Sequence, residues 1–347
     1  MRFYEQHHKY YCGVDLHARS MYLCIQDDRG TVLFHKNLPT DGDAFKSAVA
    51  DYRENLVVAV ECMFSWYWLA DLCTQMNIAF VLGHALYMKA IHGGKTKNDK
   101  IDSKKIASLL RAKLLPMAYV YPEAHRSTRD LLRRRMYFMH HQSELLVHIQ
   151  NTNTQYNLPG FAKRISYQSN RAGLAEQFPD PMVSKSIDAD VELLDVYHAI
   201  LLKLEQQVLE QARIHDPVAL GLLRTTPGIG KILALVMIYE IHDINRFPRI
   251  GNFISYCRLV KPAHESAGKK QGSKNSKIGN VHLKWAFSEA ACLFLRGNKH
   301  AQEYHERLVS KYGKAKALSI IAQKLGRAVY TMLKRKQPFD PNKFFQS

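Results

Sequence analysis

The first forty residues or so alternate between apolar and polar positions in a way that predicts β-structure. Residues 10–16 (YYCGVDL) and 20–26 (SMYLCIQ) have the character of strands, and the turn DDRG separates the second from a third run at 31–37. We therefore expect an antiparallel meander of three strands to open the chain.

Helices then alternate with buried strands. A helical stretch over about 43–53 precedes the continuous apolar run LVVAVE at 56–61, which is typical of a strand buried on both faces. A further helix over about 66–76 and a strand at 78–82 continue a β-α-β alternation. Three meander strands followed by parallel strands with crossover helices is the order of an RNase H-like sheet.

From about residue 124 the apolar positions recur at spacings of three and four, which predicts long helices. The two series are Leu132, Met136, Met139, Ser143 and Leu146, and Leu194, Tyr197, Leu201, Leu204 and Val208. The segment 158–181 between them carries three prolines and two glycines, so it is a loop or a locally folded excursion at the tip of an antiparallel arm. The sequence leaves open whether the arm is an intramolecular hairpin or a dimerising coiled coil.

Beyond Pro217 the pattern is helical and basic, and Glu265 is the only acidic residue between Arg246 and Ser288. This shift in composition indicates a domain boundary. The fold class is α/β plus α, with three parts expected: a mixed-sheet domain over 1–122, a helical arm over 123–216 and a mostly helical domain over 217–347.

The net charge of the chain indicates what kind of partner it binds. The 347 residues include 49 Lys and Arg against 31 Asp and Glu, a formal net charge of +18, which favours a polyanionic partner and nucleic acid above all. No apolar stretch approaches the roughly 18 to 20 residues that span a bilayer, and the first residues lack the apolar run of a secretory signal. We expect a cytoplasmic protein with no membrane partner.

The six cysteines are scattered without a C-x-x-C pair, and most have apolar neighbours. Reduced, mostly buried thiols are the expected state, and no zinc site is indicated.

Four acidic residues have positions that suit metal chemistry. Asp15 lies in the first strand, on the face opposite to its apolar neighbours, and Glu61 ends the buried strand. Asp99 and Asp102 are spaced to share one helical face or a helix start. Taken singly, each could be a cap or a solvated charge. Together they predict a cluster at one sheet edge that would hold Mg²⁺ or Mn²⁺ for two-metal phosphoryl transfer.

The basic half carries two features that suit phosphate binding. The segment LLRTTPGIGKILALVMIYEI predicts a helix-hairpin-helix, in which Gly228, Gly230 and Lys231 would meet a phosphate, although an ordinary helix-helix turn has the same pattern. A lysine-rich segment with small residues follows, and a solvated loop is its simplest alternative. Its candidate DNA-binding lysines are Lys261, Lys269, Lys270, Lys274, Lys277 and Lys284.

These motifs together resemble one family. GVDLH, VAVECMFSWYW and KNDKIDSKKIASLL look like the RuvC-like domain of the DEDD insertion-sequence transposases, with the order D, E, D, D matched by the four acids above. PGIG, SAGK at 266–269 and SKIGN at 276–280 are similar to that family's C-terminal transposase domain. The resemblance covers roughly residues 10 to 120 and 218 to 300.

The resemblance implies that Ser266 is a nucleophile, since it matches the serine that precedes the glycines in that family. Many relatives have Ser-Gly-Gly-Lys where this chain has Ser-Ala-Gly-Lys, which leaves Ser273 and Ser276 as alternatives. A serine is a weak nucleophile until a base, a metal or a cationic pocket activates it. His264, Lys269 and Lys270 are close in sequence.

The implied activity is metal-dependent cleavage and exchange of donor and target DNA through a phosphoserine intermediate. The RuvC-like domain of one subunit would work with the serine domain of another in a homodimer or homotetramer, guided by a structured RNA (a bridge RNA) encoded by the element. The alternative enzyme is a nuclease or junction resolvase that uses water. A third class, a non-catalytic nucleic-acid-binding protein, is disfavoured because an unused acidic cluster would repel DNA.

Overall fold

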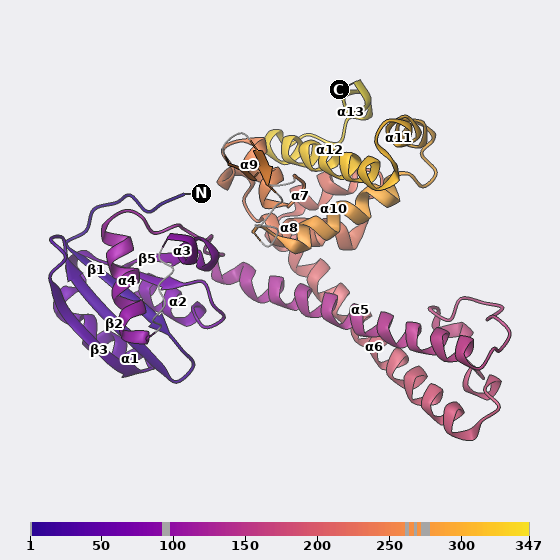
Figure 1. Cartoon of the computed structure of the whole chain (residues 1–347), viewed down its shortest axis with the longest axis horizontal. Coiled ribbons are helices and arrows are strands. Elements are labelled where there is room, and N and C mark those ends of the chain that lie inside the picture. Colours follow the sequence, from indigo (N-terminus) through magenta and orange to yellow (C-terminus); the bar gives the residue numbers. More distant parts are fainter. Residues whose placement is uncertain (1, 92–97, 261–263, 267–268, 272–277, 347) are drawn as a thin grey trace. The chain divides into compact units, whose positions relative to one another are not determined.

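A computed structural model describes the whole chain except residues 1, 92–97, 261–263, 267–268, 272–277 and 347. The described residues belong to two compact units, Met1–Glu123 (unit 1) and Ala124–Ser347 (unit 2) (Figure 1). Each unit has its own hydrophobic core, and the predicted arm belongs to unit 2 in this division.

Unit 1 is built on a five-stranded mixed sheet of order β3-β2-β1-β4-β5. The strands are β1 (Tyr10–Leu16), β2 (Ser20–Asp27), β3 (Val32–Pro39), β4 (Leu56–Glu61) and β5 (Ala79–Gly83). The first three pair antiparallel, whereas β4 is parallel to both β1 and β5. The predicted meander and the parallel strands after it are confirmed, and the sheet is consistent with an RNase H-like domain.

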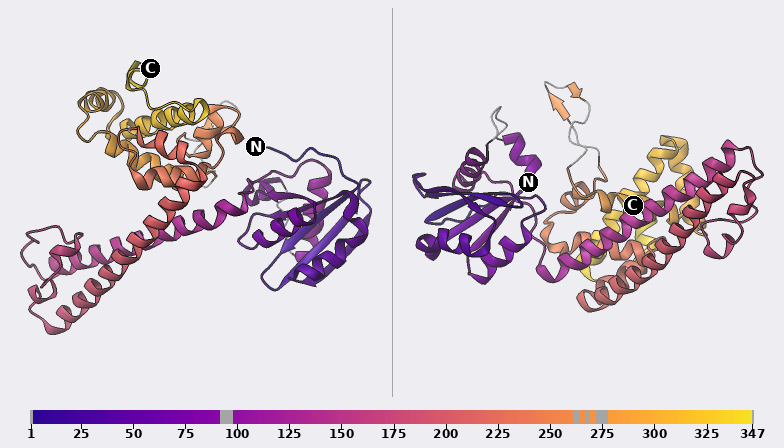
Figure 2. Two further views of the ribbon diagram at one scale, coloured as in Figure 1. Left: turned by 180° about the vertical axis from the view of Figure 1, so that it is seen from behind. Right: turned by 90° about the horizontal axis from the view of Figure 1, so that it is seen from below.

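Helices cover both faces of this sheet (Figure 2, right). On one face α1 (Gly42–Val49) and α2 (Tyr67–Gln75) share a core with the apolar side chains of β1 and β2. On the other face α4 (Asp99–Arg111) packs on β1 and β4. Side chains of β4 enter both cores, as the continuous apolar run predicted. The helix α3 (Ala85–Ile91) and the short 3-10 helix η1 (Ala50–Asn55) complete the described part of unit 1.

Unit 2 begins with two long helices that lie side by side, α5 (Glu123–Gln155) and α6 (Pro181–His215) (Figure 1). Four buried positions of α6 are seven residues apart, Ile187, Leu194, Leu201 and Val208, and a fifth, Ala212, follows four residues later. Polar contacts join the two helices: Arg135 forms an ion pair with Glu205, and the His148 ring is hydrogen-bonded to the Asp190 carboxylate. The two helices of the arm therefore pair within one chain, and dimerisation through the arm stays a prediction.

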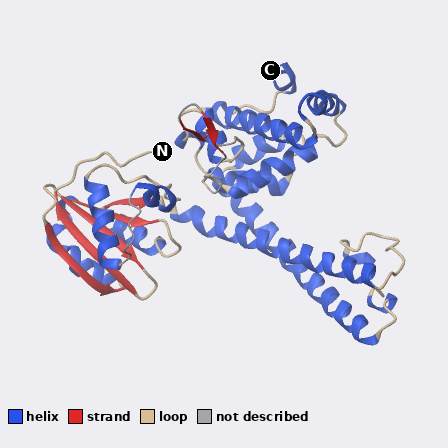
Figure 3. Cartoon of the chain, in the orientation of Figure 1, coloured by secondary structure: helices blue, strands red, loops and turns tan. Residues whose placement is uncertain are grey.

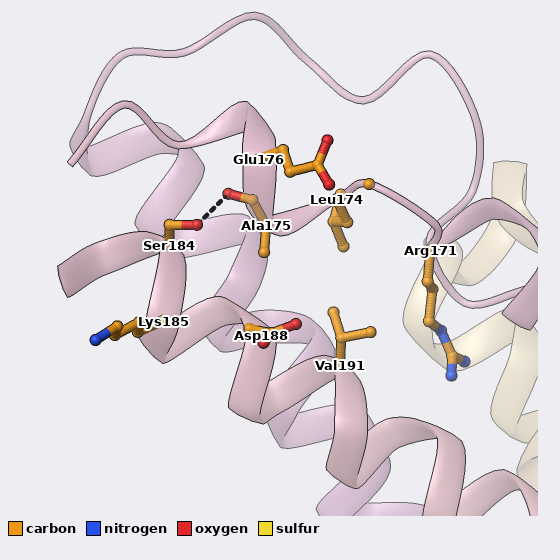
Figure 4. Close-up of a pocket in the computed structure, with 9 residues that line it drawn as sticks. Arg171, Leu174, Ala175, Glu176, Ser184, Lys185, Asp188 and Val191 are labelled. Atoms are coloured by element: carbon orange, nitrogen blue, oxygen red, sulfur yellow. Dashed lines mark hydrogen bonds between the residues drawn. The ribbon is translucent and has the colours of Figure 1, made fainter. Parts of the chain in front are cut away.

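The tip of the arm, residues 156–180, is a locally folded excursion, as the prolines and glycines suggested. It contains the 3-10 helices η2 (Gln168–Asn170) and η3 (Ala175–Gln177), and it buries Leu174 and Phe178 against the arm. Pro181 starts α6 directly after the capping residue Asp180. Figure 4 shows the cavity of about 230 Å³ between the tip and α6, where the Ser184 hydroxyl donates to the Ala175 carbonyl.

The rest of unit 2 is a helical cluster around α8, whose residues from Leu233 to Ile241 are all buried. Its other helices are α7 (Pro217–Arg224), η4 (Ile244–Arg246), α9 (Ile250–Tyr256), α10 (Val281–Phe294), α11 (Lys299–Tyr312), α12 (Lys314–Arg335) and α13 (Pro341–Gln346), and α8 itself is Lys231–Ile241. The short strands β6 (His264–Ser266) and β7 (Lys269–Gln271) form an antiparallel pair (Figure 3).

Two expectations from composition meet the structure here. Within the described residues, no helix combines the length and the apolarity that crossing a bilayer requires. All six cysteines are free; four are buried, whereas Cys62 and Cys292 are exposed.

Candidate active site

The carboxyl ends of two parallel strands bring Asp15 and Glu61 to one edge of the sheet. Val14 of β1 is in register with Val60 of β4, so the next residue of each strand is an acid. The pKa of Asp15 is raised: burial is the largest cause, His17 opposes it, and Asp99, Asp102 and Glu61 raise it further. The other three predicted acids therefore lie close enough to Asp15 to raise its pKa.

Helix α4 supplies the other two acids from its first turn. Asn98 caps the helix, because its side-chain oxygen accepts from the Lys100 amide, and Asp99 and Asp102 follow at once. Acidic residues are stabilised in the first turn by the helix dipole. Of the two placements that the sequence left open for this pair, a shared helical face or a helix start, the structure shows the helix start.

The close approach of α4 to β1 depends on Gly13. A Cβ placed on Gly13 would overlap the Ser103 carbonyl oxygen and the Ala107 amide nitrogen of α4. Only a residue without a side chain lets the two backbones pack this closely. Gly13 is two residues from Asp15, so it sets how near the first turn of α4 comes to that acid.

The side-chain ligand atoms of Asp15, His17 and Asp99 lie within 4.8 Å of one another. The Nε2 atom of His17 is 3.6 Å from an oxygen of Asp15 and 3.6 Å from an oxygen of Asp99. Sequence reasoning missed His17, although it follows Asp15 by two residues and so lies on the same side of an extended chain. Glu61 and Asp102 are outside this group of three, and Lys105 is 3.3 Å from Asp102.

The donor set fits a divalent metal ion. Carboxylate oxygens are the ligands that Mg²⁺ and Mn²⁺ prefer, and several of them raise one another's pKa when no cation lies between them. Asp15 is 18% exposed, while Asp99 and His17 are each more than half exposed. A metal held here would be open to a substrate on the solvent side.

The glycine turn between α7 and α8 lies against α10. Gly228 has a φ of +83°, and a Cβ there would lie 2.6 Å from the Phe294 amide nitrogen. Packing is therefore sufficient to explain this glycine. Gly230, which precedes α8, is exposed, and Lys231 is 3.2 Å from Glu205 of α6.

The predicted nucleophile lies at the end of β6. Ser266 pairs with Lys269 across the hairpin, and Glu265 pairs with Lys270. Lys284 is exposed in the first turn of α10. The other predicted residues of this segment lie outside the described residues: Lys261, Lys274, Lys277 and the alternative serines Ser273 and Ser276. The four acids belong to unit 1, and Ser266 belongs to unit 2.

The two ends of the segment that carries Ser266 are held together. The backbone N–H of Asn280 donates to the Tyr256 carbonyl oxygen at 2.6 Å, and the Arg258 side chain donates to the Ile278 carbonyl oxygen at 3.1 Å. Gly279, with a φ of +98°, permits this contact because a Cβ there would lie 2.6 Å from the Tyr256 oxygen.

A buried carboxylate that sequence reasoning missed holds the end of this segment. Glu240 is 2% exposed and accepts hydrogen bonds from Arg129 and Arg133 of α5 and, at 2.7 Å, from the Asn280 side chain. Burial alone would raise its pKa, but the bonds and charges of the arginines outweigh burial and lower the pKa to about 2. The Asn280 oxygen caps α10 by accepting from the Leu283 amide.

Comparisons with known proteins match both ends of the chain. Residues 12–157 match a family model described as "Transposase", and residues 220–306 match one described as "Transposase IS116/IS110/IS902 family". A relative described as "Transposase for insertion sequence element IS1111A", from Coxiella burnetii (strain RSA 493 / Nine Mile phase I), is 21% identical over 343 residues. The match covers 94% of this chain and 90% of the relative.

Proposed function

The chain is a DEDD transposase of the IS110 family, and from this premise we propose that it cuts and rejoins insertion-sequence DNA by metal-dependent phosphoryl transfer through a phosphoserine. The observation that carries the proposal is the cluster of acids at the carboxyl edge of the sheet, where Asp15, Asp99 and His17 converge and Glu61 and Asp102 lie near. Asp15, Glu61, Asp99 and Asp102 hold Mg²⁺ or Mn²⁺ in this proposal.

Each acid has a defined part in the proposed site. Asp15 and Glu61, fixed on adjacent parallel strands, provide the rigid side of the site, and Asp99 and Asp102 complete it from the first turn of α4. A bound divalent ion would neutralise charge on the scissile phosphate and stabilise the leaving oxygen. The exposed side of the cluster receives the phosphate.

In the covalent step, the Oγ atom of Ser266 attacks the phosphorus of the scissile bond. A bond forms between Oγ and phosphorus, the bond from phosphorus to one deoxyribose oxygen breaks, and the proton lost by the hydroxyl ends on that leaving oxygen. A DNA hydroxyl later attacks the phosphoserine and reverses these changes with a new partner. Lys269 and Lys270 lie on β7, the strand that pairs with β6, and their positive charges would favour the negative transition state.

Other parts of unit 2 bind nucleic acid or join subunits in this proposal. The α7 turn and α8 act as a helix-hairpin-helix at the DNA backbone, supported by the exposed Gly230 before α8. The net charge of +18 suits donor DNA, target DNA and a guide RNA together.

The arm supports a homodimer or homotetramer as a coiled coil, so that acids of one subunit meet the serine of another. The activity belongs in the cytoplasm of a bacterium or archaeon, at its DNA.

A strand-cleavage assay tests this function. Wild type, Ser266→Ala and Asp15→Ala are incubated with donor DNA, the RNA transcribed from the flank of the element, and Mg²⁺, and a denaturing gel separates protein attached to DNA. We expect an adduct with wild type and none with either variant. Persistent cleavage by Ser266→Ala without an adduct contradicts the phosphoserine.

A nuclease or junction resolvase that uses water is the second candidate, and His17 favours it. An imidazole between two acids is a suitable base for a water molecule at the same edge. In that case His17→Gln abolishes cleavage, whereas Ser266→Ala leaves it intact. The phosphoserine proposal expects the opposite order of severity.

A further inference from the structure

The last long helix, α12, has an unusual charge. Its 22 residues contain no aspartate or glutamate. Its basic residues are Lys314, Lys316, Lys324, Arg327, Lys334 and Arg335. The helix begins after residue 306, where the match to the transposase family model ends, so neither family model accounts for it.

One face of α12 is buried and the opposite face is basic. Ile321, Leu325 and Val329 pack into the core of unit 2, and Ala317 is buried on the same side of the helix. Lys316, Arg327 and Lys334 are exposed and separated by eleven and seven residues. At roughly 100° per residue these intervals place the three side chains within about 20° of one line along the helix.

This row of cations is long and straight. A rise of about 1.5 Å per residue separates its members by roughly 16 Å and 10 Å, so the row spans about 27 Å. Figure 1 shows α12 as an unbroken helix. The phosphates of one DNA strand advance about 3.4 Å along the duplex axis, so a row of this length can reach several of them.

The charges of the row are not neutralised within the described part of unit 2. None of the ion pairs there includes Lys316, Arg327 or Lys334. Lys334 donates to the neutral amide oxygen of Asn245 at 2.7 Å, and Lys316 lies over the Tyr312 ring. Uncompensated cations at fixed spacing attract a polyanion whose charges are also at fixed spacing.

We propose that the exposed face of α12 binds the sugar-phosphate backbone of duplex DNA. The inference rests on the proposed function only in taking DNA as the substrate. We take DNA as the occupant because the proposed function cuts DNA, and duplex flanks lie next to the strand that is cut. Lysine and arginine side chains in a single row position a duplex without reading its sequence, so this surface holds flanking DNA of any sequence.

The salt dependence of binding tests this surface in the full-length chain. The α12 variant carries Lys316→Gln, Arg327→Gln and Lys334→Gln. Its matched control removes three exposed cations from α6 by Lys185→Gln, Lys203→Gln and Arg213→Gln. Affinity for a mixed-sequence DNA duplex is measured between about 50 and 200 mM salt. We expect the slope of log affinity against log salt to become shallower by about 0.9 for each lost contact in the α12 variant, and to change far less in the control.

Other outcomes overturn the proposal. An equal change of slope in both variants would mean that only net charge matters, and no change in the α12 variant would mean that the row does not contact DNA. A loss confined to an RNA duplex of equal length, or to vesicles rich in anionic lipid, would assign the surface to that partner instead. A charge-preserving variant, Lys316→Arg with Arg327→Lys, should keep the wild-type slope if the protein folds and charge is responsible. The binding measurement needs no cleavage, so it stands apart from failure of the phosphoserine proposal.

Discussion

Each unit contains a carboxylate with a shifted pKa, and the two shifts have opposite directions. In unit 1, Asp15 is partly buried beside other acids, and its pKa is raised above the ordinary value of 3.8, first by burial and then by those acids. In unit 2, Glu240 is more deeply buried, yet its pKa falls to about 2 because Arg133 and Arg129 surround it. Burial has the same sign in both places, and the neighbours decide the result.

This difference separates a structural carboxylate from a chemical one. Glu240 has a hydrogen-bond partner at each oxygen and joins α5, α8 and the start of α10. Asp15 has only the His17 imidazole as an opposing group and is repelled by Asp99, Asp102 and Glu61. This arrangement destabilises the fold unless a cation is bound. Such groups cluster where a site needs them, which is why Asp15 is the better candidate for chemistry.

The largest effect should come from removing the charge of Glu240. Glu240→Gln removes the buried carboxylate that two partly exposed arginines share, and breaking a buried ion pair in this way costs about 3 to 5 kcal/mol of unfolding free energy. Urea unfolding measures it. Glu144→Gln, which removes an exposed partner of His141, is the control and should cost less than about 0.5 kcal/mol. A loss below about 1 kcal/mol for Glu240→Gln would show that the network is not structural.

Asp15→Asn should show the reverse pattern. We expect the rate of DNA cleavage to fall by more than the roughly 100-fold that is typical when a residue supporting a metal ligand is lost. The free energy of unfolding should stay constant or rise, because repulsion among the acids is relieved. Single-turnover cleavage and thermal unfolding are measured together. Asp43→Asn changes an exposed acid of the same unit, paired with Lys46, and should leave both unchanged. A clear drop in the melting temperature of Asp15→Asn would mean that Asp15, like Glu240, is structural.

Gly13→Ala sharpens the comparison by moving an acid instead of removing one. The added methyl pushes α4 away from β1, which should cost about 1 to 3 kcal/mol of stability. Displacement of Asp99 by even about 1 Å should slow cleavage on the order of 100-fold. Gly42→Ala is the matched control, since a Cβ there meets Leu72 at an ordinary 3.7 Å. If Gly13→Ala is as active as Gly42→Ala, the position of α4 does not limit the reaction.

The pH dependence of stability gives the smallest and most direct contrast. The stabilisation from Glu240 is complete above its ordinary pKa of 4.5 and is lost as the pH falls from there to about 2. Asp15 has a raised pKa, so its contribution favours folding below pH 3.8 and is lost as the pH rises. Wild type should therefore lose its advantage over Glu240→Gln on acidification, and Asp15→Asn should lose its advantage over wild type. Acid titrations of urea midpoints measure both, and parallel curves for all three proteins would contradict the assignment.

Local patterns were enough to predict much of unit 1. Alternation predicted β1 and β2, the apolar run predicted β4, and the spacing of Asp99 and Asp102 predicted that both acids belong to one helix, either on one face or at its start. These features depend on neighbours in sequence. The same reasoning anticipated the arm, because the seven-residue interval from Leu194 to Leu201 is also local.

What escaped prediction depends on residues that are far apart in sequence. Glu240 is 111 residues from Arg129 and 40 residues from Asn280, and no local pattern pairs them. The role of Gly13 depends on a helix that begins at Asp99. Ser266 and the four acids belong to different units, and the assignment of Ser266 as the nucleophile rests on the family resemblance.

The packing of α4 against Gly13 bears on how mobile elements of this kind lose their mobility. A single nucleotide change in a glycine codon can give alanine, and the copy that carries it keeps every acid and the serine of its motif. A survey that scores copies as intact from those residues alone would count this copy as active. Copies should also be sorted by whether position 13 is still glycine, because the absence of a Cβ there lets α4 bring its acids close to Asp15.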